Sequence, residues 1–395
     1  MSECDHPVGA SITLDELERD PHVMLARLRD AEPVSYVSAL DGWLVTGYDL
    51  ALSVMRDSRT FTVDDPRFST ARVLGPSMLS LDGSEHDRHR GPFARPFRRS
   101  EVRDRFTPVV RDEAEALIDA FAERGTADLR TEFAAPLAAS VMIAALGLDG
   151  LDRAAVLEWY AAIVAGVNGA SASMPIAPAA HTAFASLRAA LVDVLERGDS
   201  ASLLVSAAAE AGSVTQAEVI SNAAVLLFGG IETTEGAIAN LLLHVLKSPV
   251  EQELIVNDRG LIVNAVEESL RLEPAAAAID RYATAECKLG GVTIGQGDLV
   301  IVSLAGANRD PAVFEGPDRF DVRRENARTH LSFAQGPHVC LGLHLARLEA
   351  RTALDRALSR LPGVELVEAA ASEPRGRIFR KPPTLTVSFD PERAR

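Results

Sequence analysis

Cysteine is scarce in this chain of 395 residues, and long apolar runs are absent. The three cysteines, Cys4, Cys287 and Cys340, cannot form the disulfide framework of a small secreted protein, so we expect the reducing cytoplasm as the compartment. The most apolar stretch, residues 219–231, is interrupted by a serine and an asparagine and is too short to span a bilayer. The N-terminus has neither the basic nor the apolar region of a signal peptide. We therefore expect no membrane partner.

Positive charge is also in short supply, since 40 Lys and Arg stand against 56 Asp and Glu and the formal net charge is −16. Such a balance argues against a nucleic-acid partner, because phosphate binding needs a basic surface. Residues 86–105 are the exception, with seven arginines and three acidic residues. A basic segment on an acidic protein fits either a small acidic partner or a solvated face, and the composition leaves both open.

Hydrophobic residues make up 47% and charged residues 24%, which describes a globular protein with a large core. Apolar spacing of three and four predicts helices almost throughout residues 101–246, broken by a Gly-, Ala- and Pro-rich segment at 167–180 that resembles a lid. Two strands are expected around the Asp41–Gly42 turn, and short strands follow Pro274. The prediction is a mainly α fold with a smaller β-rich lobe. Because the lobes interleave along the chain, residues 1–395 are expected to form one domain.

A helix predicted over residues 216–247 has a capping box at Thr215 and a Ser-Pro stop. In its middle stand Gly229 and Gly230, each costing about 1 kcal/mol relative to Ala in a helix. Glu232 and Thr233 follow directly. These residues fit a helix kink with a capped polar group, or a groove over a flat ligand with a proton-handling pair at its edge.

Cys340 stands where a Gly- and Pro-bearing loop ends and a long helix begins. The N–H groups and the partial positive charge of a helix N-terminus stabilise a thiolate, so this cysteine is expected to be a metal ligand or a nucleophile. A zinc site with His338 and His344, and a nucleophilic cysteine with His338 as base, are the alternatives. Upstream, His86 and Arg90 share one helical face and form a potential anion clamp.

Taken in order, these segments resemble the cytochromes P450 in their soluble bacterial form. "FAQGPHVCLG", from Phe333 to Gly342, matches the family's haem loop, and "GGIETT" matches its oxygen-groove helix. "ESLR", from Glu268 to Arg271, matches its E-x-x-R motif, and "GPDRFDVRR" matches the meander before the haem loop. One departure is Ala334, where a second glycine is common.

The resemblance implies a fold in which haem b is buried between the long central helix and the helix after the cysteine loop. Cys340 is then the thiolate ligand of the iron, Phe333 shields its sulfur, and Glu232 and Thr233 deliver protons during O2 activation. Further haem contacts are implied for His86, Arg90, Gly229, Gly230, Arg281, His338 and Gly342. Glu268 and Arg271, with Arg319 or Arg323 of the meander, are implied to be structural.

The implied activity is that of a monooxygenase that oxidises a small, largely apolar molecule in bacterial specialised metabolism. The same machinery performs oxidative C–C or C–N coupling, and a haem-binding sensor without turnover is a further alternative. A ferredoxin with a separate NAD(P)H reductase is the implied electron donor, docking on the arginines of 86–105 and on Arg347. A monomer is expected. Pocket residues are expected to be Leu227, Phe228, Ala275, Ile279, Ile378 and Phe379.

Overall fold

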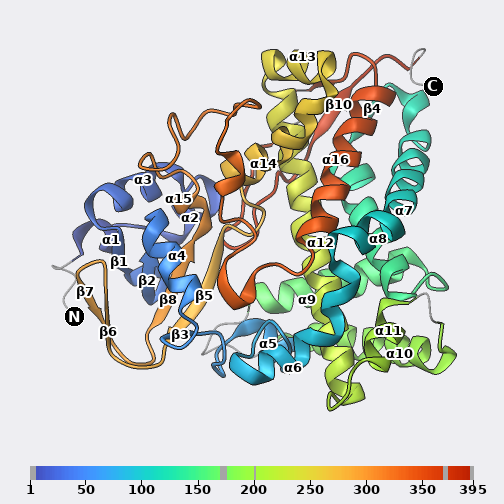
Figure 1. Cartoon of the computed structure of the whole chain (residues 1–395). Helices are drawn as coiled ribbons and strands as arrows, with labels where there is room; N and C mark the ends of the chain where they lie inside the picture. Colours follow the sequence, from blue (N-terminus) through green and yellow to red (C-terminus); the bar gives the residue numbers. More distant parts are fainter. Residues whose placement is uncertain (1–5, 170–175, 200–201, 368–371, 392–395) are drawn as a thin grey trace. The chain divides into compact units, whose positions relative to one another are not determined.

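The computed structural model describes residues 6–169, 176–199, 202–367 and 372–391 (Figure 1). The chain divides into two compact units, each assembled from segments that are far apart in the sequence. The first unit comprises Met1–Thr62, Ala114–Ala135 and Thr233–Arg395, and the second comprises Val63–Glu113 and Pro136–Glu232. The segments interleave as expected, while one domain over residues 1–395 stays a prediction.

All strands of the described residues belong to the first unit, which confirms a mainly α fold with a β-rich part. They are β1 (Val34–Val37), β2 (Gly42–Val45), β3 (Phe61–Thr62), β4 (Thr126–Asp128), β5 (Ala278–Ala283), β6 (Cys287–Leu289), β7 (Val292–Ile294), β8 (Leu299–Ser303), β9 (Glu365–Leu366) and β10 (Thr386–Ser388). The largest sheet has the order β1-β2-β8-β5-β3, in which only β2 and β8 run parallel. β4, β10 and β9 form a second sheet, and β6 and β7 form a hairpin.

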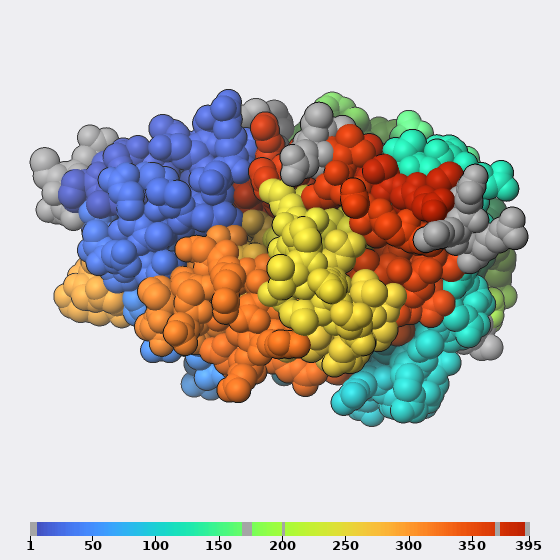
Figure 2. Space-filling view, turned by 90° about the horizontal axis from the view of Figure 1, so that it is seen from above, coloured from blue at the N-terminus to red at the C-terminus, as the bar shows by residue number. Residues whose placement is uncertain are grey.

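The predicted turn between the first two strands is confirmed. Asp41 has a left-handed φ of 49°, which Asp tolerates better than most residues, and its carboxylate accepts a hydrogen bond of 2.6 Å from the Tyr36 hydroxyl. Trp43, a residue of β2 in this hairpin, is fully buried in the apolar core of the first unit. Figure 2 shows the N-terminal part of the unit (blue) against residues 300–330 (orange). One hydrogen bond between these parts of the chain is donated by the Tyr48 hydroxyl to the Thr329 carbonyl at 2.6 Å.

Nine helices of the described residues are assigned to the first unit in whole or in large part. They are α1 (Pro7–Ala10), α2 (Leu14–Arg19), α3 (His22–Ala31), α4 (Tyr48–Arg56), α13 (Pro249–Asn257), α14 (Ile262–Leu272), α15 (Leu304–Ala307), α16 (Leu343–Arg360) and the second half of α12 (Gln216–Leu246). The helix expected after Cys340 is α16, which starts at Leu343.

Among its described residues, the second unit contains helices and the loops that join them, and no β-strand. Its helices are α5 (Ser69–Leu74), α6 (Gly83–Ala94), most of α7 (Arg99–Asp119), α8 (Ala135–Leu146), α9 (Arg153–Gly169), α10 (Pro178–Arg197), α11 (Leu203–Ala209) and the first half of α12. α9 and α10 pack closely at Gly166, where an added Cβ would lie 2.4 Å from Cβ of Ala180. Of the lid expected at 167–180, residues 167–169 belong to α9 and residues 178–180 belong to α10, while residues 170–175 are outside the described residues.

The long helix α12 closely matches its predicted bounds, and its capping box is present. The backbone N–H and hydroxyl of Thr215 both donate to the carboxylate of Glu218, and the N–H of Glu218 donates to the Thr215 hydroxyl. With 31 residues α12 is about 45 Å long. Among the described residues it is the one helix long and apolar enough to cross a membrane, yet 78% of its apolar window is buried, as in the core helix of a globular fold.

Residues 101–246, predicted to be helical almost throughout, contain one strand and one irregular helical turn that were not expected. Residues Thr126–Asp128 form β4, and Arg130–Ala134 form a π-helical turn before α8. β4 exists because it pairs with β10, whose residues are about 260 positions away in the sequence. The spacing of apolar residues within a segment cannot predict that the segment pairs with a strand so far away in the sequence.

Candidate functional site

The loop around Cys340 has a backbone that only some residues can adopt. Gly336 has a φ of +74°, and a Cβ there would lie 2.5 Å from the carbonyl oxygen of Met55, so glycine is required on both counts. Ala334 has a φ of +56°, which costs a non-glycine residue about 1–2 kcal/mol. The position where a glycine is common is therefore strained in this chain for a conformational reason rather than for lack of space. The N–H of Cys340 donates to the carbonyl of Phe333 at 2.8 Å, which closes the loop.

The residues around the thiol fit a flat, apolar group. Val339, Leu341 and Leu343 are only half-buried, although apolar side chains of the first unit are mostly in its core. A Cβ added at Gly342 would meet nothing within 4 Å, so there is open space beside the loop. A soft thiolate donor next to an open apolar face suits a haem iron.

The metal alternative can be tested on the same residues. Over the parts of the chain that the structure describes, which include His338, Cys340 and His344, no three His, Cys, Asp or Glu side chains gather as metal ligands would. The zinc alternative therefore has no geometric support.

In α12, one face remains reachable along a helix that is otherwise buried. Leu226, Gly229, Gly230 and Thr233 are partly exposed, and their spacing of three and four places them on one side of the helix. The two glycines differ. A Cβ at Gly230 would lie 2.4 Å from the sulfur of Met142 on α8, whereas a Cβ at Gly229 would meet nothing within 4 Å. The groove interpretation of this helix fits Gly229, while Gly230 is needed for helix packing.

Glu232 lies beside this accessible face but is itself buried, with 5% exposure. Its carboxylate accepts a hydrogen bond from the hydroxyl of Tyr160, which is on α9 and also buried. Tyr160 was not among the predicted site residues, since a single tyrosine in an amphipathic helix carries no local signal of its partner. Thr233 follows on the same helix and is the one partly exposed residue of 231–240.

The remaining predicted haem contacts are distributed over both units. His86 and Arg90 lie on α6 of the second unit, as the spacing predicted, and His86 is buried with its Nδ1 3.3 Å from Asp87. Arg281 lies within β5 and His338 in the 3-10 turn before Cys340, both in the first unit. A common role at one haem stays a prediction for these four residues.

Two predicted pocket segments of the first unit are paired by their backbones. The N–H of Ala277 donates to the carbonyl of Ile378 at 2.7 Å, and Ala275 faces Gly236 of α12, where an added Cβ would lie 2.9 Å from its own. Ile279 is partly buried against the core of the first unit. Leu227 and Phe228 are buried on α12 in the second unit, and Phe379 forms a β-bridge with Ala276.

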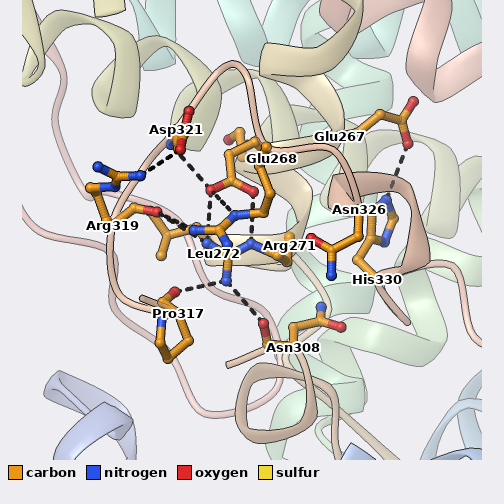
Figure 3. Close-up of polar contacts among 12 residues, drawn as sticks. Glu267, Glu268, Arg271, Leu272, Asn308, Pro317, Arg319, Asp321, Asn326 and His330 are labelled. Carbon is orange, nitrogen blue, oxygen red and sulfur yellow. Dashed lines mark hydrogen bonds and ion pairs between the residues drawn. The ribbon is translucent and has the colours of Figure 1, made fainter. Parts of the chain in front are cut away.

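The E-x-x-R motif forms a buried ion-pair network (Figure 3). Glu268 and Arg271 are both fully buried and are joined by two hydrogen bonds of 2.7 and 2.8 Å. The third partner is Arg324, whose Nε donates to Glu268 at 2.9 Å. The expectation of Arg319 or Arg323 was wrong by one residue, because Arg323 points to solvent and Arg319 contributes its carbonyl to Arg271.

This network fixes the meander as well as the helix. Arg271 donates to the carbonyls of Asn308 and Pro317 at 3.0 and 2.7 Å. Arg324 donates to the carbonyls of Glu315 and Gly316 at 2.6 and 3.1 Å. Two guanidinium groups thus satisfy buried backbone carbonyls of an irregular segment. Glu268 and Arg271 have a structural role, as the resemblance implied.

The arginine-rich segment 86–105 is partly neutralised by ion pairs within the second unit. Examples of arginines paired with acidic side chains are Arg88 with Glu85 and Glu218, Arg95 with Glu210, and Arg103 with Asp104. Arg98 and Arg99 are exposed, and no ion pair with another described residue involves them. The charge left for an outside partner is therefore concentrated on these two residues.

Comparisons with known proteins point to one family. The family model described as "Cytochrome P450" matches residues 185–368. The chain is 38% identical to cytochrome P450 monooxygenase PikC of Streptomyces venezuelae, over 88% of this chain and 85% of that protein. It is 35% identical to mycinamicin IV hydroxylase/epoxidase of Micromonospora griseorubida, over 91% and 93%. The solved structure of the cytochrome P450 CxnD, described as an enzyme for C–S bond formation in chuangxinmycin biosynthesis, is similar with a TM-score of 0.85 at 29% identity, covering 97% of this chain and 99% of that one.

Proposed function

This chain belongs to the cytochrome P450 family, and we propose on that premise which of its residues carry the family's chemistry and which molecules it meets. The protein is a haem-thiolate monooxygenase of a bacterial type. The haem iron, bound by a cysteine thiolate, supplies the activation of O2. The observation that carries the residue assignment is the Cys340 loop, with its closing hydrogen bond to Phe333 and the open space beside Gly342. Cys340 is the ligand in this proposal.

The test is spectroscopic. The purified protein should contain b-type haem, and its reduced CO complex should show the absorption band of a thiolate ligand. Cys340→Ala should lose that band, whereas Cys287→Ala in β6 should keep it. A colourless protein that carries zinc, or a Cys340→Ala variant with an unchanged band, would refute the assignment.

The anionic propionates of the haem are assigned to His86, Arg90, Arg281 and His338. Two guanidinium groups and two imidazoles offer the charge-assisted hydrogen bonds that carboxylates need. Arg281 is nearly buried, with 4% exposure, and a buried charge is stable only with a counter-charge or several hydrogen bonds. Arg281 donates to the carbonyl of Asp280 at 2.7 Å, and a guanidinium group carries five N–H donors in a fixed fork that suits a carboxylate.

Proton handling is assigned to Glu232 and Thr233 of α12. Thr233 presents a hydroxyl on the accessible face of the helix, where it can hold a water or a substrate oxygen in place. Glu232 is buried beside it and exchanges protons by turning its carboxylate between Tyr160 and that face. Gly229 keeps the face open next to them.

The substrate is proposed to be a largely apolar specialised metabolite. Support comes from the apolar residues expected to line the pocket and from relatives that are named as a mycinamicin hydroxylase/epoxidase and a 20-oxo-5-O-mycaminosyltylactone 23-monooxygenase. Titration with a panel of macrolide-type and other apolar metabolites should identify ligands that shift the spin state of the iron. If only small hydrophilic compounds produced a shift, the substrate proposal would fail.

Oxidative coupling is a second candidate, because one similar structure is named for C–S bond formation. The two outcomes differ in product mass: insertion adds one oxygen atom, whereas coupling removes two hydrogens. Mass spectrometry of the product from a confirmed ligand separates them.

A ferredoxin with its own NAD(P)H reductase is proposed as the electron donor, and Arg98 and Arg99 are proposed as part of its docking surface. An acidic ferredoxin is complementary to the two unpaired cations. The protein is proposed to act as a monomer in the cytoplasm. Large apolar side chains that remain exposed over the described parts of the chain are Leu14, Val23, Val250 and Val256, which is little for a permanent dimer interface.

A further inference from the structure

Glu267, the residue before the E-x-x-R motif, is a buried carboxylate, and Figure 3 shows its contact with His330. Arg347 of α16 donates to it from Nε at 2.8 Å and from Nη2 at 2.7 Å. His330, in the segment leading to the cysteine loop, lies with Nε2 3.2 Å from the same carboxylate. One acidic group of α14 therefore holds both the helix that follows Cys340 and the segment that precedes it.

The hydrogen bonds and burial of this cluster favour an ionised Glu267 and a neutral His330. Burial alone would raise the pKa of Glu267, but the hydrogen bonds from His330 and Arg347 outweigh it and lower the pKa to about 2. Burial lowers the pKa of His330 despite the neighbouring carboxylate, so the imidazole is neutral at physiological pH. Its Nδ1 accepts from the N–H of Ser332 at 3.1 Å, which places the single proton on Nε2, where it points to Glu267.

Both partners of Glu267 also contact the ring of Phe333. The guanidinium carbon of Arg347 lies 4.5 Å from the ring centroid, within the range of a cation–π interaction. The imidazole of His330 lies 5.6 Å from the same centroid. Since the carbonyl of Phe333 accepts the N–H of Cys340 at 2.8 Å, an unbroken series of contacts links Glu267 to the cysteine backbone.

We propose that Glu267 is a positioning residue for the Cys340 thiolate, acting through Arg347 and His330 on the ring and backbone of Phe333. This inference rests on the proposed function, because it concerns a thiolate that binds haem iron. It also changes the role suggested for Arg347 in partner docking. The side chain of Arg347 is 20% exposed, and its charge is largely offset by the bidentate pair with Glu267.

The expected consequence follows from what outer contacts do for a metal ligand. Residues that orient a ligand typically change metal affinity or activity by about 10–100-fold when they are lost. Without the Glu267 carboxylate, Arg347 loses its anchor and the Phe333 ring loses a fixed position over the loop. The Cys340 loop would then be held less firmly and its sulfur would be a less well positioned ligand for a haem iron, so the thiolate-type complex is expected to be lost sooner.

The experiment compares Glu267→Gln and Arg347→Lys with the unchanged holoenzyme. Lys keeps the charge of Arg347 but has neither the planar fork for Glu267 nor the flat face for Phe333. Arg328→Gln is the control, since Arg328 is an exposed arginine just before His330. The reduced CO complex is followed by absorption over time, which measures the conversion of the thiolate-type band into the non-thiolate form. Haem content and the unfolding temperature are measured in parallel.

Both variants should convert about tenfold faster or more, while Arg328→Gln converts at the rate of the unchanged protein. Equal conversion rates in all proteins, with only the unfolding temperature lowered, would overturn the inference and leave Glu267 a purely structural residue. If Glu267→Gln does not fold, Arg347→Lys decides the question. Absence of the thiolate band from the unchanged protein would instead refute the assignment of Cys340, so the two failures are distinguishable.

Discussion

The hydroxyl of Tyr160 on α9 donates a hydrogen bond to the carboxylate of Glu232 on α12. Both side chains are buried, at 8% and 5% exposure. The acid assigned to proton handling is therefore held by the neighbouring helix and has to leave that partner before it can turn toward Thr233. Glu232 and Thr233 are therefore assigned to proton transfer, whereas Tyr160 is assigned to holding the Glu232 side chain.

Three variants separate these roles. Thr233→Ala should bind haem and substrate almost normally, yet lose about tenfold or more in product formed per electron, with the difference appearing as hydrogen peroxide. Glu232→Gln should slow the whole cycle, because the supply of protons falls. Tyr160→Phe removes the hydrogen bond that holds Glu232, so coupling and turnover should stay at least as high as in the unchanged protein. NAD(P)H consumption, peroxide and product are measured for each.

Two results would contradict this scheme. If Thr233→Ala stays fully coupled, the pair is structural or the substrate supplies its own hydroxyl. A slow Tyr160→Phe variant, with the kinetic defect of Glu232→Gln, would make the phenol part of the proton route.

The sequence predicted those parts of the protein that local patterns determine. The bounds of α12 followed from its capping box, and the loop of Cys340 followed from a motif of ten residues. Tyr160 and Glu232 are 72 positions apart, and the pairing of Arg324 with Glu268 spans 56. Such contacts depend on how the chain folds back on itself, so a choice among neighbouring arginines cannot be made from their spacing.

The role of Arg324 can be tested against its exposed neighbour. Arg324→Met leaves the fully buried carboxylate of Glu268 with one guanidinium fewer and frees two carbonyls of the meander. Breaking a buried pair on one side costs about 3–5 kcal/mol, so the free energy of unfolding should fall by that amount. Arg323→Met should change it by less than about 0.5 kcal/mol, because that side chain is exposed. Denaturant unfolding of the two variants gives the answer, and equal losses would refute the assignment.

The docking surface can be tested by charge reversal. Arg98→Glu with Arg99→Glu should slow reduction by a ferredoxin and weaken the salt dependence of that rate. Arg188→Glu is the matched control, because Arg188 is an exposed arginine of α10 in the same unit. Turnover driven by added peroxide needs no ferredoxin and should be unchanged in all variants. A parallel loss of both activities would show that residues 98 and 99 have a structural function.

Glu349 of α16 offers a test of pH dependence. It is buried, at 1% exposure, and its Oε2 has no hydrogen-bond partner among the described residues. Burial raises the pKa of this carboxyl well above the usual 4.5, so the folded protein retains its proton where the unfolded chain has released it. A raised acid pKa means that the folded state binds more protons than the unfolded state above 4.5. The free energy of unfolding must then decrease as pH rises from there toward the folded pKa.

Glu349→Gln removes this linkage while it keeps the size and shape of the side chain. The variant should unfold at a higher temperature than the unchanged holoenzyme at about pH 8, and the advantage should disappear at about pH 4, where Glu349 is protonated in both states. Glu325→Gln is the control, because Glu325 is exposed and should give the same small effect at both pH values. An advantage of Glu349→Gln that did not vary with pH would show that the carboxyl is already paired in solution. An unfolding temperature below that of the unchanged protein at about pH 8 would mean that the ionised carboxylate contributes to stability, and the buried, protonated state inferred from the structure would be wrong.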